Sequence, residues 1–205
     1  MSLTSYSDPY RNVPDISLQN FLSRPIQIAS YTWSQSTDLV EDFDPWRFFI
    51  LNPRVANRLN NYKMFSAKLH VKAVVNGNSF FYGLSGLHYV PMYNDSITTT
   101  DVVSRPLFNN ANVSTAYLTM ASQFPKIFIN PTTSQGGTLE LPFIYDRNMC
   151  DLTAGEVGLL GQCLLRSYNV LDHANGATDT VGITIYAWMT DVKMSGLTRK
   201  SIFGL

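Results

Sequence analysis

Three kinds of residue in this 205-residue chain could do acid-base, nucleophilic or metal chemistry: clustered carboxylates, histidines and cysteines. The carboxylates lie together in the segment Glu41-Asp42-Phe43-Asp44, where paired acids could transfer protons or hold a cation. Because Pro45 follows directly, and adjacent acids before a proline are typical of a solvated turn, we interpret the segment as a surface loop.

The histidines and cysteines show no spacing that metal sites require. His70 and His88 fall in predicted strands and His173 in a predicted loop, and none belongs to an H-x-x-x-H or Cys/His motif. Cys150 and Cys163 are too few for a disulfide framework and lack C-x-x-C spacing, so we expect two buried free thiols. The sequence has no G-x-S-x-G elbow and no phosphate-binding glycine loop. We therefore predict no enzymatic activity, no metal and no cofactor.

The elements that would position these residues are mainly β-strands, because the hydrophobic period is mostly two. The alternation is cleanest in the segment from Val181 to Val192, and Lys68–Val75 places Lys68, His70 and Lys72 opposite an apolar face. Eight strands are predicted: Arg24–Trp33, Trp46–Leu51, Lys68–Val75, Ser79–Val90, Lys126–Asn130, Thr138–Tyr145, Glu156–Tyr168 and Val181–Val192.

Two short helices interrupt the strands. The first has Asn52 as N-cap and Pro53 at its first position, and the second follows Ser114 and covers residues 115 to about 122. The polar stretch Met92–Val113 and the segment Leu171–Asp179 are predicted to be surface loops.

The first 23 residues have no sustained period, and we interpret them as an extended arm that a partner orders. Residues 24–198 then form one all-β domain and residues 199–205 a C-terminal tail. The candidate subunit-contact residues in the arm are Tyr6, Tyr10, Ile16 and Phe21.

Composition narrows the range of partners. The chain has no formal net charge and only 15% charged residues, so much of its surface must be neutral, as suits extensive contacts with other proteins. The longest basic run is the pair Arg199-Lys200, so we expect any contact with nucleic acid to be weak or shared. No apolar run reaches the roughly 18 residues of a membrane span, and the segment from Met1 to Asp15 does not read as a secretory signal.

Several strings, in order along the chain, resemble the major capsid subunits of picorna-like viruses (order Picornavirales), closest to the dicistrovirus and marnavirus branches. Taken singly these strings are weak, but their shared order over about residues 20–198 is specific. They are FLSRPI (residues 21–26), DPW (44–46), NPRV (52–55), VNGNSFFYG (75–83), SQFPKIFINPTTSQGG (122–137), LPFIY (141–145) and AWMTDVKMSG (187–196).

The resemblance implies an eight-stranded antiparallel jelly-roll sandwich, which agrees with the independent strand count. It further implies a structural capsid subunit that joins two sibling jelly rolls, sixty copies of each, in an icosahedral pseudo-T=3 shell around positive-sense single-stranded RNA. The implied partners also include a small internal capsid protein and a host receptor, and the implied location is the virion, assembled in the host cytoplasm.

Some family members carry an Asp-Asp-Phe motif linked to autocatalytic maturation of a precursor subunit. The string Glu41-Asp42-Phe43 departs from that motif at its first residue, which leaves Asp42 as the candidate. The family often meets RNA through basic termini, and this chain has none, so little direct basic contact with the genome is expected.

Two functions of other classes remain open. A carbohydrate- or receptor-binding β-sandwich would share the aromatic and neutral polar composition. A jelly-roll enzyme of the cupin kind would need clustered metal-binding histidines, and the three histidines here are scattered.

Overall fold

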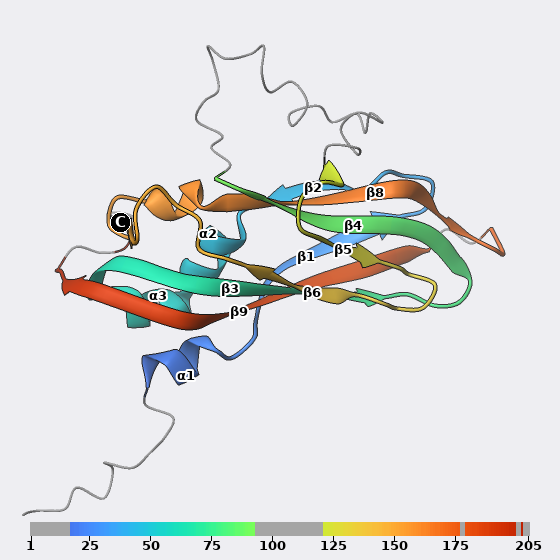
Figure 1. Cartoon of the computed structure of the whole chain (residues 1–205). Coiled ribbons are helices and arrows are strands. Elements are labelled where there is room, and N and C mark those ends of the chain that lie inside the picture. The colour runs from blue at the N-terminus through green and yellow to red at the C-terminus, as the bar shows by residue number, and fades with distance from the viewer. Residues whose placement is uncertain (1–16, 93–120, 177–178, 200–201, 203–205) are drawn as a thin grey trace, which may run out of the picture.

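The chain folds as two antiparallel β-sheets stacked face to face (Figure 1), as seen in a computed structural model that describes residues 17–92, 121–176, 179–199 and 202. The five-stranded sheet has the order β1-β9-β3-β6, and β7 pairs with β3 outside this path. The four-stranded sheet has the order β2-β8-β4-β5. The strands of the first sheet are β1 (Ile26–Ser34), β3 (Tyr62–Asn76), β6 (Gly137–Leu141), β7 (Cys150–Asp151) and β9 (Thr180–Leu197). Those of the second are β2 (Val40–Phe43), β4 (Phe81–Pro91), β5 (Lys126–Ile129) and β8 (Gly161–His173).

The connections give the sandwich two different ends. The links β1–β2, β3–β4, β5–β6 and β8–β9 all cross from one sheet to the other, and they gather at the right-hand end of Figure 1. The opposite end holds α2 (Pro45–Ile50), α3 (Pro53–Leu59) and the 3-10 helix η2 (Glu156–Leu159), while α1 (Leu18–Leu22) lies outside the five-stranded sheet against β9. We call these the loop end and the helical end. This crossing pattern is that of a jelly roll and confirms the predicted fold class.

The core lies between the sheets. Leu69 and Val71 of β3 are fully buried, and so are the inward residues of β9, which alternate along the strand as the sequence predicts: Val181, Ile183, Ile185, Ala187 and Met189. At the helical end Trp46 Nε1 donates to the Tyr89 hydroxyl over 3.0 Å, and that hydroxyl donates to the Leu160 carbonyl over 2.9 Å. The buried aromatic core therefore has satisfied polar groups where the two sheets meet the helices.

The second predicted strand is wrong, because Trp46–Leu51 is largely the helix α2. Asp44 caps this helix by accepting from the Arg47 amide over 2.9 Å, and Pro45 occupies its first turn. Trp46, Phe49 and Ile50 are buried at helical spacing. The strand that completes the set of eight is β2, which includes the acidic residues interpreted as a surface loop.

Other boundaries also differ. Glu156–Leu159 is a 3-10 turn, so the predicted strand at 156–168 begins instead at Gly161, and it continues through Leu171 and His173, which were assigned to a loop. The end of the predicted extended arm is the helix α1, whose N-cap Ser17 accepts from the Asn20 amide. The helix after Asn52 is confirmed as α3. The second predicted helix and the loop from Met92 to Val113 fall almost entirely outside the described residues. Among the described residues, no helix is long and apolar enough to cross a membrane.

Candidate functional site

Asp42 is held in a salt bridge by Arg166, the neighbouring basic residue across the β2–β8 ladder. An Arg166 Nη2 atom contacts Asp42 Oδ1, and Nη1 donates to the Glu41 carbonyl over 2.8 Å and to the Leu165 carbonyl over 3.0 Å. The Arg166 side chain is almost completely buried, whereas about a third of Asp42 is exposed. The carboxylate therefore neutralises a buried guanidinium and joins an edge strand to the sheet. Its role in maturation stays a prediction.

Asp44, the last of the three carboxylates in the cluster, faces the interior of the helical end. Burial raises the pKa of this carboxyl to about 6, against the opposing effects of the Arg47 amide and charge. A carboxyl whose pKa is raised can act as a general acid, but here it accepts from the backbone as a helix cap. Asp42 and Asp44 thus serve as a salt-bridge partner and an N-cap, and they do not form a paired-carboxylate site.

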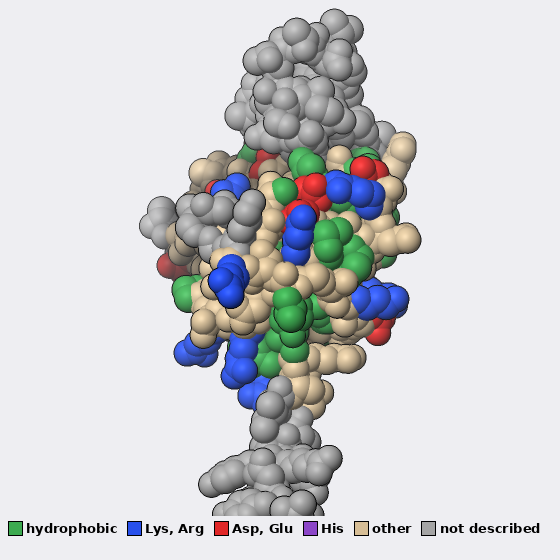
Figure 2. Space-filling view, turned by 90° about the vertical axis from the view of Figure 1, so that its left-hand side faces the viewer, with side chains coloured by type: hydrophobic (Ala, Val, Ile, Leu, Met, Phe, Trp, Pro, Cys, Tyr) green, Lys and Arg blue, Asp and Glu red, His purple; other side chains and the backbone are tan. Residues whose placement is uncertain are grey.

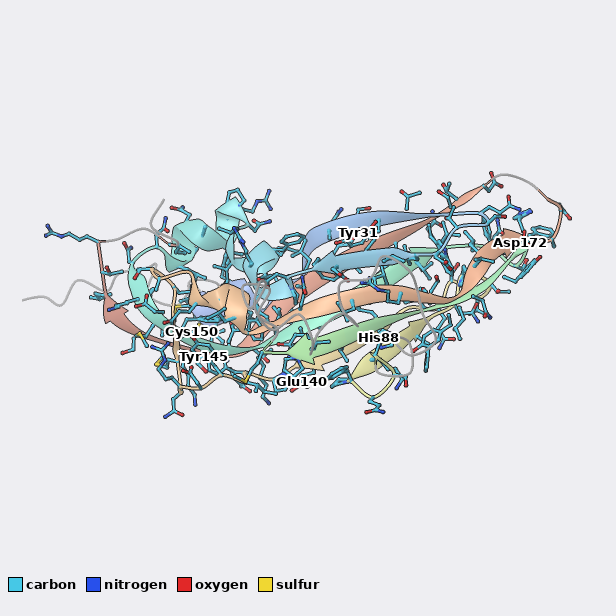
Figure 3. All side chains as sticks on the ribbon, turned by 90° about the horizontal axis from the view of Figure 1, so that it is seen from above. Tyr31, His88, Glu140, Tyr145, Cys150 and Asp172 are labelled. Carbon is cyan, nitrogen blue, oxygen red and sulfur yellow. The ribbon has the colours of Figure 1, made fainter. Side chains whose placement is uncertain are left out.

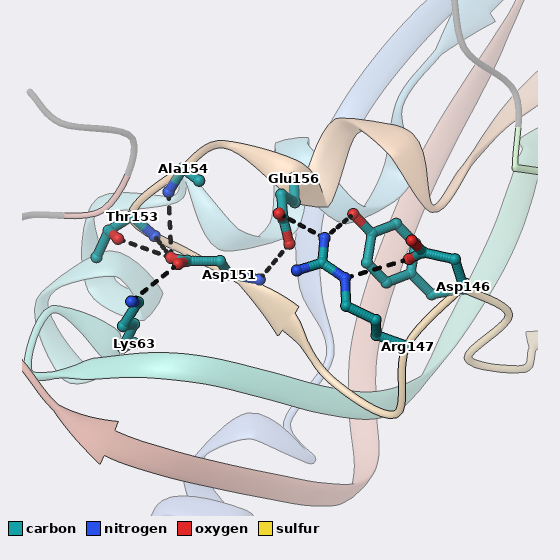
Figure 4. A network of polar contacts seen from close by, with 8 residues as sticks. Lys63, Asp146, Arg147, Asp151, Thr153, Ala154 and Glu156 are labelled. Carbon is teal, nitrogen blue, oxygen red and sulfur yellow. Dashed lines mark hydrogen bonds and ion pairs between the residues drawn. The ribbon is translucent and has the colours of Figure 1, made fainter.

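A larger polar network joins the segment before β8 to the edge of β3 (Figure 4). Arg147 donates to Glu156 Oε1 over 2.6 Å, and Glu156 Oε2 accepts from the Asp151 amide over 2.7 Å. Asp151 in turn accepts from the Thr153 hydroxyl over 2.7 Å and lies 3.5 Å from Lys63 Nζ. Partial burial raises the pKa of both carboxyls, but these hydrogen bonds and cations outweigh it, so both pKa values end below their usual range. Because each carboxylate is ionised and fully bonded, the network stabilises a long connection and offers no free acid.

The three histidines lie in separate places (Figure 3 labels His88). His70 stacks on Trp188 on the outer face of the five-stranded sheet, with ring centroids 5.3 Å apart. His88 lies on the outer face of the four-stranded sheet, and His173 packs its ring against Phe81 at the loop end. Among the described residues, no three histidine, cysteine or acidic side chains group as metal ligands would. The positions of the histidines disfavour the cupin alternative.

The two cysteines are buried free thiols, as predicted. Burial raises the pKa of Cys150 to about 12 and also raises that of Cys163, whose pKa the nearby Asp44 raises further. A thiol that stays protonated is a poor nucleophile, so neither cysteine fits a catalytic role.

The outer face of the four-stranded sheet carries an aromatic surface that the sequence did not reveal. Phe128 is 49% exposed, and its ring lies 5.7 Å from that of Tyr168 and 5.9 Å from Lys126 Nζ. Val170, further along β8, is 45% exposed. We call these residues, together with Tyr82 of β4, the outer aromatic surface. Exposed aromatic groups of this kind, beside a polar margin, are typical of protein–protein interfaces.

Towards the loop end this surface includes a polar margin. Tyr82, 52% exposed, donates through its hydroxyl to Asp172 Oδ2 over 2.6 Å, and Gln35 donates to Asp172 Oδ1 over 2.9 Å. The hydrogen bond from Tyr82, with those from Gln35 and the His173 amide, keeps the pKa of Asp172 below its usual value. Figure 3 shows Asp172 at the end of the molecule remote from Cys150. The carboxylate therefore holds Tyr82 in a fixed, outward position.

Only one predicted contact residue of the arm is described. Phe21 is half-buried on α1, packs against the core, and lies 5.2 Å from the Arg58 guanidinium. Tyr6, Tyr10 and Ile16 lie outside the described residues, so their interface role stays a prediction. The outer aromatic surface was missed because its members come from three strands whose order in the sheet is not visible in the sequence.

Comparison with known proteins shows which proteins this chain is similar to. The scan against protein-family models gave no match. The chain is 24% identical over 192 residues to the structural polyprotein of Cricket paralysis virus, a match that covers 91% of this chain and 20% of the polyprotein. It therefore spans about a fifth of that relative.

Solved structures match over nearly the whole chain. A chain of a marine algae virus of the order Picornavirales is 32% identical, with a TM-score of 0.80, over 98% of this chain and 84% of that one. Triatoma virus gives 18% identity and a TM-score of 0.76, over 98% of this chain and 79% of that one. A chain of the Kashmir bee virus virion at neutral pH gives 18% identity and a TM-score of 0.78, over 100% of this chain and 86% of that one.

The last two similarities show the shared fold, and the first, at 32% identity over most of both chains, shows the family. The jelly-roll strand order, the scattered histidines and the inert thiols all fit a structural role. The protein belongs to the jelly-roll capsid proteins of the order Picornavirales.

Proposed function

We propose that this chain is one of three jelly-roll subunits of an icosahedral picorna-like virion, present in sixty copies around a single-stranded RNA genome. The single observation that carries this function is the 32% identity to the marine algae virus over 98% of the chain. Solved relatives of the same fold come from virions and, for Israeli acute paralysis virus, from a pentamer. The host cytoplasm is the proposed site of assembly, and cleavage from a structural polyprotein the proposed origin.

The subunit would meet its neighbours through flat side faces. The outer aromatic surface is the proposed contact on the four-stranded sheet, because it exposes large apolar groups beside a polar margin. The arm residues Tyr6, Tyr10, Ile16 and Phe21 are a second proposed contact, and Asp42 remains the candidate for a maturation step. A small internal capsid protein and a host receptor are further proposed partners.

Electron microscopy of purified particles, with mass spectrometry of their proteins, tests the proposal. We expect an icosahedral shell that contains this chain in equal copy number with two other subunits. A soluble monomer that binds a glycan would contradict it and favour the carbohydrate- or receptor-binding module.

The proposed contact can be tested within the shell. Phe128→Ser removes a 49% exposed ring from the outer aromatic surface, and Val74→Ser, at a 41% exposed site on β3, is its matched control. We expect the first substitution to reduce the yield of particles more than the second at equal amounts of folded subunit. Equal yields would exclude the outer aromatic surface as a contact.

A further inference from the structure

The dipeptide Asn-Gly occurs twice in this chain, and both copies lie at the loop end. Asn76 is the last residue of β3 and Gly77 begins the link to β4, whereas Asn175 and Gly176 lie in the turn between β8 and β9. Asparagine is one of the thermolabile residues of proteins, and a following glycine favours loss of its side-chain amide because glycine has no Cβ to hinder the approach of its backbone nitrogen. The two copies therefore share the same local chemistry and differ in what surrounds them.

The loss of the amide needs only water as a reactant. The glycine backbone nitrogen, after giving its proton to solvent, attacks Cγ of the asparagine side chain, and the side-chain nitrogen leaves with a proton as ammonia. Water then opens the resulting succinimide ring at either of its carbonyls, which yields aspartate or isoaspartate. Asparagine and water thus become a carboxylate and ammonia, without an oxidant, a reductant or a cofactor. The backbone must be free to turn the glycine nitrogen towards Cγ.

Gly77 is held in place by the link between β5 and β6. A Cβ at Gly77 would lie 2.0 Å from the Pro131 carbonyl oxygen, so the backbone of that link packs directly against this residue. The Ser134 hydroxyl donates to the Gly77 carbonyl over 2.9 Å and accepts from the Gly77 amide over 3.3 Å. Asn76 itself is paired opposite Gly182 in the β3–β9 ladder. Turning the Gly77 nitrogen towards Asn76 would separate two links and open the end of the ladder.

Gly176 has no such constraint. It is exposed, as is Asn175, and a Cβ at Gly176 would meet nothing within 4 Å. Its φ of 65° lies in the left-handed region that glycine adopts in tight turns. The Gly176 amide donates to the His173 carbonyl over 2.9 Å, which closes the turn. Because this hydrogen bond lies within the turn, it can open and be replaced by water without a change in either sheet.

We propose that Asn175 is a site of spontaneous deamidation in the folded chain, where it becomes aspartate or isoaspartate, and that the contacts of Gly77 protect Asn76 from the same reaction. The inference goes beyond the proposed function and does not depend on it, because the reaction needs only the turn between β8 and β9. No enzyme takes part, so the converted fraction increases with the age of the protein.

The reaction changes the charge of the loop end. Figure 2, which looks onto the helical end, shows lysine, arginine and acidic side chains there. The four links at the loop end contain no lysine or arginine, and their acidic residues are Asp38 and Asp179. A new carboxylate at position 175 therefore adds negative charge that no basic residue of these links neutralises. It also lies close in sequence to Asp172, whose pKa is already below its usual value.

Peptide mapping by mass spectrometry tests the proposal on the full chain. The folded protein is kept in mildly alkaline buffer below its unfolding temperature, and the amide and acid forms of Asn76 and Asn175 are quantified over time. A second sample in urea gives the intrinsic rates of the two pairs. We expect Asn175 to convert at least about tenfold faster than Asn76 in the folded chain, which corresponds to about 1.4 kcal/mol in the free energy of local opening. In urea the two rates should be similar.

Two substitutions test the cause of the difference. Ser134→Ala removes both hydrogen bonds to Gly77, so Asn76 should convert faster while Asn175 keeps its rate. Gly176→Ala places a Cβ next to the attacking nitrogen, so Asn175 should convert much more slowly. Alanine is strained at the φ of residue 176, and continued protection of Asn76 in the same sample shows that this variant is folded.

Equal rates at the two sites in the folded chain would overturn the proposal, as would faster conversion of Asn76. An intact Asn175 after a time in which the chain in urea has converted would also overturn it. An unchanged rate at Asn76 in Ser134→Ala would refute the protection assigned to the Ser134 hydrogen bonds. Particle formation is not a readout here, so failure of the proposed function would leave this inference in place.

Discussion

The outer faces of the two sheets differ in how they meet solvent. On the five-stranded sheet, β3 exposes Lys68 and Lys72, and its ion pairs are open to water. On the four-stranded sheet, the outward residues His88, Leu164 and Arg166 are buried, and Leu164 packs with Val90 and Ala121 in a small cluster. One sheet is therefore half-buried, and the other is buried on both faces at its centre.

The difference shows where polar groups cost stability. On the four-stranded sheet, His88 Nδ1 and Gln162 Oε1 are buried and have no hydrogen-bond partner among the described residues. The lysines of β3 are instead exposed, and Lys68 pairs with exposed carboxylates. Burying an unsatisfied group is unfavourable, and removing one partner of a buried pair is worse. Substitutions at equivalent outward positions should therefore have much larger effects on the four-stranded sheet.

The largest effect is expected for Arg166→Met. It removes the cation that pairs with Asp42 and one donor to each of two backbone carbonyls. We expect a loss of about 2–3 kcal/mol in the free energy of unfolding, below the usual range because Asp42 is partly exposed. Urea denaturation of the full chain measures it. A variant as stable as the wild type would show that the salt bridge is replaceable by apolar packing.

A matched pair of glycines compares the two faces directly. A Cβ at Gly86 of β4 would lie 2.7 Å from His88 Nε2 and 3.0 Å from Tyr168, whereas a Cβ at Gly182 of β9 would meet nothing within 4 Å. We expect Gly86→Ala to destabilise by about 1–2 kcal/mol through overpacking and Gly182→Ala to be neutral or slightly stabilising. Thermal unfolding of both variants checks this, and equal melting temperatures would remove the distinction between the faces.

His88 should make stability depend on pH. Burial, with Lys126 and Arg166 nearby, lowers its pKa from 6.5 to about 4, so between these values the unfolded chain binds the proton that the folded chain does not. The stability of the fold should therefore decrease as the pH falls from about 6.5 to 4. His88→Leu should abolish this pH-dependent loss of stability.

Asp44 acts in the opposite direction, because its pKa is raised to about 6 and the folded chain binds the extra proton between 3.8 and 6. Asp44→Asn should therefore make the loss of stability on acidification steeper. Denaturation midpoints of the wild type and both variants across pH 4 to 7 test the direction of the two effects. If the midpoints of a variant change with pH as those of the wild type do, the role given to that residue is wrong.

The smallest effect is expected on the five-stranded sheet. Lys68 lies 3.3 Å from Asp191 and 3.5 Å from Glu140, but all three side chains are about half exposed. Since exposed ion pairs contribute little, Lys68→Ser should leave the denaturation midpoint unchanged at moderate salt. A clear loss that persists at high salt would mean that this face is not solvated as described.

The sequence alone determined those strands and helices that have one face in the core and the other in water. The alternation in β3 and β9 and the cap at Asn52 were read correctly because half-buried strands and capped helices leave local patterns. The family resemblance, carried by strings along most of the chain, also required only the sequence, and with it the jelly-roll fold.

The tertiary structure decided what depends on neighbours distant in the chain. An aromatic-rich segment, Trp46–Leu51, became a helix because Asp44 caps it and the sheets enclose three of its side chains. The acidic residues before it became an edge strand because Arg166, more than a hundred residues away, supplies the matching cation. The outer aromatic surface likewise assembles single residues from separate elements, and no local pattern records which elements will lie side by side.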